Sequence, residues 1–430
     1  MTPESDIVAG AEEKAPRPAG ISPLPASGQS LSDEGGGAAV YDALSRYLWQ
    51  HTEPMDAESF REVSAFYGEY QGLVAELDMP ARFHELADAA ARADLDAFND
   101  AAQVRLVVAG HDLKFMKELL PRLESTYRLR IDQWENHTKH DERASEDLLA
   151  WADLVWAEWL LGAAVWYSER LRPEQRMVVR AHRSEWGVAY GEHLRADRVD
   201  AFLTVSPHAR SDFIDRFDLP ASRTWMVPNS IEIDEYRQGD DPERVFSLAM
   251  VGALPKLKGL HKALELLSQL RDVDDRYTLT IYGKRPDELS WLTKISSEME
   301  YFASCDELIS ASALQDAVVW AGWVNTREAL ADHGFVLSTS ELEGFHIAPG
   351  EGFSSGGVGV FLDWRGVREI YPHEFIFDDV AAMRDYILEL RDLERFEAAH
   401  KAGLAWLRRH YDTEVVWADA RRVLSAVHQR

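Results

Sequence analysis

The sequence has very little cysteine and no long apolar run. Cys305 is the single cysteine among 430 residues. One thiol excludes an intrachain disulfide framework and is typical of a protein from a reducing compartment. The nearest approach to a membrane span, residues 154–166, is interrupted by Glu158 and is too short to cross a bilayer. The N-terminus also lacks the basic-then-apolar pattern of a secretory signal. These absences predict a soluble, cytoplasmic protein without a membrane span.

Basic side chains are scarce relative to acidic ones. Lys and Arg number 46 against 74 Asp and Glu, so the formal net charge is −28. A surface this acidic argues against nucleic acid or anionic lipid as the main partner. The sequence also lacks clusters of His, Cys and carboxylates at metal-ligand spacing, so we expect no metal site and no bound cofactor.

The N-terminal region has an unusual composition. Residues 1–36 are rich in Pro, Gly, Ser and Glu, and this composition predicts a disordered acidic tail. Apolar residues at spacings of three and four predict a helical extension over residues 37–102. Residues 1–100 carry 19 acidic and 6 basic side chains. Two interpretations of the extension stay open: a helical cap packed on the first domain, or a surface for a protein partner or an acceptor.

Short apolar strands alternate with helical patterns from residue 103 onward, which predicts parallel sheets with helices on both faces. We expect two Rossmann-like domains, at 103–232 and 245–410, joined by a linker at 233–244 and followed by a C-terminal helix at 411–430. The expected strands lie at 104–109, 128–131, 153–156, 177–180, 201–205 and 224–227, then 245–251, 277–282, 317–320, 334–337, 358–362 and 375–377. The expected helices include 288–302, with a core face of Trp291, Ile295 and Met299, and 381–390, 393–410 and 413–428.

The most informative stretch is residues 340–369. Glu343 and Glu351 stand eight positions apart across a loop that contains Gly344 and Pro349. Pro349 suits the first turn of a helix, because its missing N–H group is not needed there. Glu351 should therefore fall in that first turn, where exposed N–H groups favour an anion. A strand, a polar loop and a helix start form the place where an α/β sheet binds phosphorylated ligands.

These residues carry a family resemblance. The stretch has Glu343-Gly344-Phe345, seven residues between Glu343 and Glu351, then Gly356 and Gly366-Val367-Arg368-Glu369. This pattern resembles the donor-site signature of retaining glycosyltransferase family 4. Members of this family have the GT-B architecture, in which two Rossmann-like domains face each other across a cleft. The resemblance implies a retaining, metal-independent hexosyltransferase in glycan biosynthesis. Its substrates would be a nucleotide-diphosphate sugar and an acceptor hydroxyl on a glycan, a lipid or a small molecule.

The resemblance also implies roles for residues of the second domain. Glu351 should accept hydrogen bonds from the nucleotide ribose, and Glu343 should contact the donor sugar near the developing positive charge. The N–H groups around Gly344, Phe345 and His346 should bind the diphosphate, and Ile347 belongs to the same donor loop.

A second loop of this domain also resembles the family's donor site. Lys258-Gly259 matches the family's Lys-Gly pair, whereas Ala253 stands where the family usually has an arginine. Lys256 and Arg285 are candidates to replace that cation, and Gly283, which follows the strand at 277–282, is a further donor-site residue.

The first domain contributes three candidates. His182 follows the fourth strand, where the family often has a histidine that faces the donor sugar, so we expect it to be catalytic together with Lys258 and Glu343. The alternative is a structural histidine. Gly110 and His111 follow the first strand and should lie on the acceptor side.

Several departures from the family pattern keep other functions open. Ala253 replaces an arginine, His346 a frequent glycine and Val358 a frequent proline. One alternative is a catalytically inactive GT-B donor-binding or partner subunit. Another is a nucleotide-sugar epimerase or phosphorylase on the same fold. A dinucleotide oxidoreductase is disfavoured, because the strand-to-helix loops lack G-x-G-x-x-G.

Overall fold

The computed structural model describes residues 55–57, 60–61, 64, 81–311 and 314–428. The chain divides into two compact units, Met1–Gln103 and Val104–Arg430. In the first unit, α3 (Ala81–Ala91) and α4 (Leu95–Ala102) are held together by Arg82, whose Nε donates to the carbonyl of Ala101 at 3.1 Å. Both helices lie in the region predicted to be helical. The predicted tail at 1–36 and residues 37–54 lie outside the described residues.

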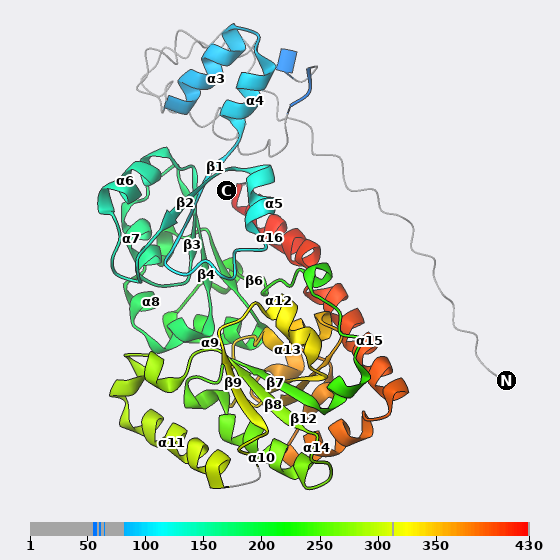
Figure 1. Ribbon diagram of the computed structural model, residues 1–430. Helices are drawn as coiled ribbons and strands as arrows, with labels where there is room; N and C mark the ends of the chain where they lie inside the picture. Colours follow the sequence, from blue (N-terminus) through cyan, green and yellow to red (C-terminus); the bar gives the residue numbers. More distant parts are fainter. Residues whose placement is uncertain (1–54, 58–59, 62–63, 65–80, 312–313, 429–430) are drawn as a thin grey trace, which may run out of the picture. The chain divides into compact units, whose positions relative to one another are not determined.

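The second unit begins with a six-stranded parallel sheet in the order β2-β1-β3-β4-β5-β6 (Figure 1). Its strands β1 and β3 are entirely buried, because helices cover both faces of a parallel sheet. The strands are β1 (Arg105–Gly110), β2 (Arg128–Gln133), β3 (Leu154–Glu158), β4 (Arg176–Ala181), β5 (Ala201–Thr204) and β6 (Thr224–Met226). The helices are α5 (Leu120–Thr126), α6 (Glu142–Trp151), α7 (Gly162–Arg170), α8 (Tyr190–His193) and α9 (Pro207–Phe217).

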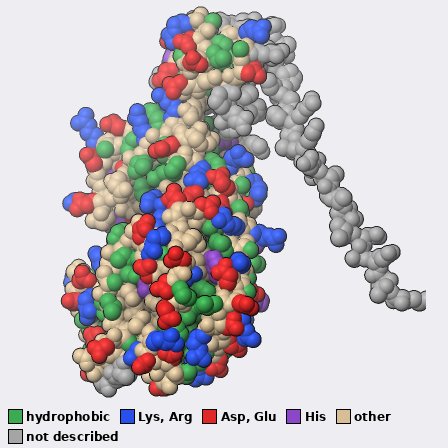
Figure 2. All heavy atoms as spheres, turned by 45° about the vertical axis from the view of Figure 1, so that its right-hand side comes forward, with side chains coloured by type: hydrophobic (Ala, Val, Ile, Leu, Met, Phe, Trp, Pro, Cys, Tyr) green, Lys and Arg blue, Asp and Glu red, His purple; other side chains and the backbone are tan. Residues whose placement is uncertain are grey.

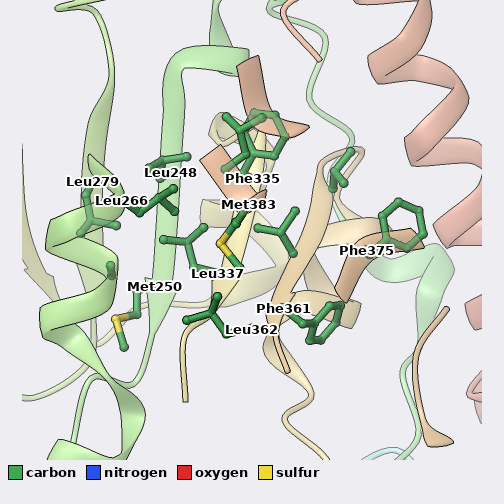
Figure 3. Packing of buried hydrophobic residues seen from close by; sticks show 14 of the residues in the cluster. Leu248, Met250, Leu266, Leu279, Phe335, Leu337, Phe361, Leu362, Phe375 and Met383 are labelled. Carbon is green, nitrogen blue, oxygen red and sulfur yellow. The ribbon is translucent and has the colours of Figure 1, made fainter. Parts of the chain in front are cut away.

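A second parallel sheet follows, in the order β12-β11-β10-β7-β8-β9. Its strands are β7 (Ser247–Val251), β8 (Thr278–Tyr282), β9 (Val318–Gly322), β10 (Phe335–Ser338), β11 (Val358–Leu362) and β12 (Ile376–Phe377). The helices are α10 (Leu260–Arg271), α11 (Ser296–Ala311), α12 (Thr326–Ala329), α13 (Ala348–Ser354), α14 (Val380–Glu389) and α15 (Leu393–His410). Figure 3 shows how Leu248 and Leu337 of the strands pack with Leu266 of α10 and Met383 of α14.

The last helix, α16 (Thr413–His428), returns from the second sheet to the first (Figure 1). Glu414 accepts a hydrogen bond from Arg122 of α5 at 2.8 Å, and the ring of His428 contacts Tyr127 at 5.8 Å. The N–H of Ile231 donates to the carbonyl of Tyr411 at 2.8 Å. The two crossings between the sheets therefore run side by side.

One predicted helix begins at the wrong place. The helix expected at 288–302 is α11, which starts only at Ser296 after two short 3-10 turns. The side chains of Trp291 and Ile295 are 51% and 42% exposed, so the predicted core face was wrong for both, whereas Met299 packs against the core. The Glu288 carboxylate accepts the N–H of Arg285 at 2.6 Å and closes the first of these short turns, before the helix can begin.

The surface carries charge of both signs. On the face shown in Figure 2, acidic and basic side chains are interspersed over the second unit. Within the described ranges, no helix has the length and apolar character needed to cross a membrane. Nor do three or more His, Cys, Asp or Glu residues of the described part of the chain gather where they could hold a metal ion.

Candidate active site

The strand order of the second sheet reverses between β7 and β10, which lie side by side. In open α/β sheets, ligands bind at the carboxyl ends of the strands where the order reverses. The loop after β7 carries Lys258, and the loop between β10 and α13 carries Glu343. Lys258 Nζ lies 2.5 Å from Glu343 Oε1. Two of the residues that the sequence predicted for the donor site are therefore in contact at the topological switch point.

A glycine allows these two loops to approach each other. Gly259 has φ +71°, and a Cβ at this position would lie 2.1 Å from the carbonyl oxygen of Thr339. The Thr339 hydroxyl in turn donates to the carbonyl of Lys258 at 3.1 Å. Only a residue without a side chain fits this backbone conformation and this contact, so Gly259 determines where Lys258 lies.

Glu343 is a buried carboxylate with three polar neighbours. Burial acts to raise the pKa of Glu343, but His346, Lys258 and Ser340 outweigh it and hold the pKa below its usual value. The Ser340 hydroxyl donates to Oε1 at 2.6 Å. Glu343 is therefore ionised at neutral pH. Sequence reasoning missed Ser340, although its spacing of three before Glu343 within one loop was a usable signal.

His346 occupies the position where the family often has glycine. Its φ is +52°, which explains why glycine is suited to this place. The Nδ1 atom lies 2.7 Å from the Ser338 hydroxyl and 3.8 Å from Glu343 Oε1, whereas the buried Nε2 has no hydrogen-bond partner among the described residues. Burial lowers the pKa of His346 to about 4. A neutral imidazole therefore lies beside the Lys258–Glu343 pair.

Glu351 lies in the first turn of α13, as the position of Pro349 predicted. Its Oε1 accepts hydrogen bonds from the Tyr236 hydroxyl at 2.9 Å and from Thr326 Oγ1 at 3.0 Å. Burial raises its pKa, and the two hydroxyl donors only partly offset that effect. Tyr236 comes from the segment predicted as a linker, so this segment packs on the second sheet. No local sequence pattern pointed to Tyr236 or Thr326.

The other residues of the donor loop contribute through their backbone. The Phe345 ring is buried against Tyr371 and Tyr411, with ring centroids 6.0 and 4.8 Å away. Ile347 is the residue immediately before α13 and packs against the core. Of Gly344, Phe345 and Ile347, none therefore presents a polar side chain.

The structure places the candidate replacement cations elsewhere. Ala253 is buried. Lys256 Nζ lies 3.4 Å from the Ser297 hydroxyl of α11, and the guanidinium of Arg285 lies over the Trp320 ring at 5.1 Å. Gly283 has φ +121° and lies next to Gly252, since a Cβ on Gly283 would be 3.6 Å from the Gly252 Cα. Lys258 is the one of these three cations that contacts Glu343.

In the first sheet, His182 follows β4 and lies between aromatic rings. Its ring centroid is 4.7 Å from that of Phe115 and 4.3 Å from that of Trp159. Its Nε2 lies 2.9 Å from Glu158 Oε1. Burial lowers the pKa of His182 although Glu158 acts to raise it. Glu158, which sequence reasoning missed, therefore fixes the orientation of the ring. The catalytic role of His182 stays a prediction.

Gly110 is the last residue of β1 and His111 follows it, and β1 lies next to β3 where the strand order of the first sheet reverses. A Cβ on Gly110 would lie 2.8 Å from the carbonyl oxygen of Glu158. The His111 ring is 6.1 Å from the Trp159 ring, and burial lowers its pKa. Both residues thus lie at the switch point of the first sheet, and their acceptor role stays a prediction.

The two halves of this unit meet at the donor loop. His208 of α9 places Nε2 at 3.0 Å from the main-chain oxygen of Glu343, so the imidazole donates to this carbonyl. A Cβ on Gly344 would lie 2.9 Å from the Cβ of Arg183, the residue after His182. The end of β4 and the β10–α13 loop are therefore packed together.

Comparison with known proteins agrees with this geometry. Residues 246–392 match the family described as Glycosyl transferases group 1, and this segment contains Lys258, Glu343 and Glu351. No curated protein matches the chain. The matched segment runs from β7 to α14, so the similarity to this family covers the second sheet and not the first.

Solved structures share the fold at low sequence identity. Anabaena HepE in complex with UDP-glucose is 14% identical with a TM-score of 0.60, and the match covers 75% of this chain and all of that one. A glycosyltransferase from Rickettsia africae is 12% identical with a TM-score of 0.56, over 76% of this chain and 98% of that one. These similarities confirm the predicted GT-B fold class.

Proposed function

We propose that this protein is a retaining glycosyltransferase that moves a sugar from a nucleotide-diphosphate sugar to an acceptor hydroxyl. The contact between Lys258 and Glu343 at the switch point of the second sheet, within the segment that matches the glycosyl transferases group 1 family, carries this proposal. The complex of Anabaena HepE with UDP-glucose supports a nucleotide sugar as the donor. Retention and membership of family 4 rest on the resemblance of the Glu343 to Glu369 signature.

The charges of the site suit the reaction. Breaking the anomeric C–O bond leaves positive charge on the sugar and negative charge on the diphosphate, and preorganised groups that meet these charges lower the barrier. The Lys258 ammonium and the N–H groups of Gly344 and His346 would stabilise the diphosphate. The Glu343 carboxylate would lie near the developing positive charge. Each charge-assisted contact contributes roughly 1.5–3 kcal/mol.

Glu351 is arranged to hold a second part of the donor. Both of its hydrogen bonds to described residues fall on Oε1, from Tyr236 and Thr326. Its Oε2 is therefore left to accept hydrogen bonds from the ribose hydroxyls. His182 would approach from the first sheet, so closure of the two halves would complete the site.

One observation favours a second candidate function, a donor-binding subunit without transferase activity. Ala253 lacks the positive charge of the arginine that family 4 usually has at this position. Neither Lys256 nor Arg285 supplies a replacement charge beside Glu343. Losing one of two diphosphate cations weakens stabilisation of the leaving group more than it weakens binding of the nucleoside. Activity therefore has to be tested separately from binding.

The binding test is thermal unfolding with UDP, GDP, ADP and TDP and their sugars. We expect one nucleotide to raise the unfolding midpoint of the wild type, since a ligand at a hundredfold excess over its Kd adds about 2.7 kcal/mol of stability. The shift should shrink strongly in Glu351→Ala. Glu341→Ala is the matched control, because Glu341 lies in the loop that leads to α13 but pairs with Lys262 at 3.7 Å. A wild type that responds to no nucleotide contradicts the proposal.

The activity test is product analysis with the nucleotide sugar that binds. We expect a glycoside with the anomeric configuration of the donor, identified by NMR, with unchanged turnover in the presence of a chelator. A sugar phosphate or a free epimer as the product would instead indicate a phosphorylase or an epimerase. Turnover that disappears in Lys258→Ala would exclude the inactive subunit, and binding without turnover would support it.

A further inference from the structure

A small cavity lies between loops of the two sheets, next to the donor loop. Its volume is about 80 Å³. The residues that line it from the first sheet are Arg183, Trp186, His208, Ala209, Asp212 and Phe213, and those from the second are Leu342, Glu343, Gly344 and Arg365. A cavity of this size holds several waters or one functional group, whereas whole ligands occupy roughly 300–1,000 Å³. It therefore suits one group of a larger ligand.

One cation that lines the cavity, Arg183, has no side-chain partner among the residues that the structure describes. Asp212 accepts two hydrogen bonds from Arg365, at 2.7 and 2.8 Å. The Glu343 carboxylate is bonded to Lys258 and Ser340. Both carboxylates of the lining are thus satisfied. The partly buried Arg183 makes no side-chain hydrogen bond or ion pair with any residue that the structure describes, in a chain with 74 acidic side chains.

The position of the cavity separates it from the diphosphate site. The side chain of Glu343 points to Lys258, whereas its main-chain oxygen accepts from His208 at 3.0 Å. His208 lines the cavity and Lys258 does not. The cavity therefore lies on the main-chain side of Glu343. Arg183 directly follows His182, at the end of β4, so a ligand here would extend from the reaction centre toward α9.

We infer that Arg183 is the anion-binding residue of an acceptor subsite, and that the acceptor carries a phosphate or carboxylate group. An arginine fork pairs bidentately with either oxyanion, and an unpaired, partly buried guanidinium is stabilised when it gains one. Trp186, 47% exposed, supplies apolar surface against which a sugar ring or an alkyl part can lie. The inference rests on the proposed function and narrows its acceptor to an anionic one.

The test uses the full chain and two anionic probes, glycerol 3-phosphate and glucuronate, which distinguish a phosphate from a carboxylate acceptor. Binding is measured by thermal unfolding at constant ionic strength, with probe concentrations up to tens of millimolar. We expect at least one probe to bind the wild type and to lose at least tenfold in affinity in Arg183→Met, with a smaller loss in Arg183→Lys. Arg195→Met is the matched control, because exposed Arg195 pairs with Asp197 at 2.9 Å.

Affinity for the nucleotide that stabilises the wild type, measured on the same variants, separates this inference from the proposed function. Unchanged nucleotide affinity in Arg183→Met, together with lost anion affinity, supports the acceptor subsite. A tenfold loss of nucleotide affinity would place Arg183 in the donor site and overturn the inference. Equal anion affinity in the wild type and Arg183→Met, or no anion binding to either, overturns it as well. A wild type that binds the anions but none of UDP, GDP, ADP and TDP contradicts the proposed function alone.

Discussion

The two sheets each hold a glutamate beside a cation at their carboxyl edge, but the two pairs differ in exposure. In the first sheet, Glu158 and Arg180 lie 3.4 Å apart and both side chains are 0% exposed. In the second sheet, Glu343 and Lys258 lie 2.5 Å apart and are 11% and 24% exposed. The same position of the same kind of sheet thus holds a sealed pair in one half and an accessible pair in the other.

The difference in exposure agrees with a structural role of the Glu158–Arg180 pair and with the proposed binding role of the Glu343–Lys258 pair. Arg180 also donates to the carbonyl of Pro228 at 2.9 Å and to Asn229 Oδ1 at 2.8 Å, so the sealed pair ties β4 to the segment that leaves the first sheet. Among the described residues, the Lys258 ammonium donates only to Glu343. It can therefore leave Glu343 to bind a ligand, or bind Glu343 and a ligand together.

We expect the largest loss of stability from removing the carboxylate of the buried Glu158–Arg180 pair. Glu158→Leu leaves the Arg180 guanidinium buried without its carboxylate, and we expect the free energy of unfolding to fall by about 3–5 kcal/mol. Urea unfolding at neutral pH measures this change. Glu343→Gln is the control: glutamine keeps a polar group at this buried position and the partly exposed Lys258 can turn to solvent, so the cost should be about 1 kcal/mol. Equal losses of unfolding free energy in the two variants would contradict this difference between the two pairs.

The next effect concerns activity. Lys258→Met removes the cation that we propose for the leaving diphosphate, so we expect kcat to fall by about 10²–10³-fold while the unfolding free energy changes little. Steady-state kinetics with the preferred donor measures this. Lys262→Met, four residues later in α10 and paired with Glu341, is the control and should keep its kcat. Loss of stability in parallel with kcat would instead make the accessible pair structural.

Two buried histidines of the second sheet make its stability depend on pH. Burial lowers the pKa values of His333 and His346 to about 4, against 6.5 ordinarily. Between these values the unfolded chain binds the protons and the folded chain does not, so stability falls as the pH drops from 6.5 to 4. Each histidine should contribute a loss of about 2 kcal/mol at pH 5. Urea unfolding at pH 7 and 5 should show a smaller loss in His346→Gln and in His333→Gln. An unchanged loss in both variants would contradict this.

The smallest effect is expected where the two halves are joined on the surface. The Arg365 and Asp212 side chains form an ion pair that is largely exposed on the arginine side. Exposed pairs contribute only about 0–1 kcal/mol, so Arg365→Met should leave the urea midpoint nearly unchanged. A loss of several kcal/mol would mean that contact between the halves, rather than each sheet by itself, limits stability.

Much of the fold could be predicted because most of its helices and strands depend on patterns among neighbouring residues. Strands such as β11 are short, continuous apolar runs, and this pattern is typical of a strand that is buried on both faces of a sheet. Helix α15 was predicted with its observed bounds from its amphipathic pattern, and in the structure Asp392 caps its start by accepting the N–H groups of Glu394 and Arg395. Helix α11 was placed too early because apolar spacing alone does not show that short turns replace the first part of a helix.

The residues of the candidate site also fall into a group that local motifs predicted and a group that only the structure shows. Lys258, Glu343 and Glu351 were predicted from motifs within two loops, and the structure brings Lys258 and Glu343 together. The partners that hold Glu351, Tyr236 and Thr326, come from other segments, 115 and 25 residues away along the chain. No local pattern can show such partners, because only the packing of separate segments brings these hydroxyls to the carboxylate.

The sequence by itself determined the two α/β halves and the donor loop, because strands, caps and glycine turns depend on neighbouring residues. Only the tertiary structure decided which charged groups are paired. Lys256 donates a hydrogen bond to Ser297, and Glu158 forms a buried ion pair with Arg180. The side chain of Arg183, in contrast, has no partner among the described residues. Whether a charge is paired depends on distances of a few ångströms between segments far apart in the chain, and these distances are set by how the loops of the two sheets pack together.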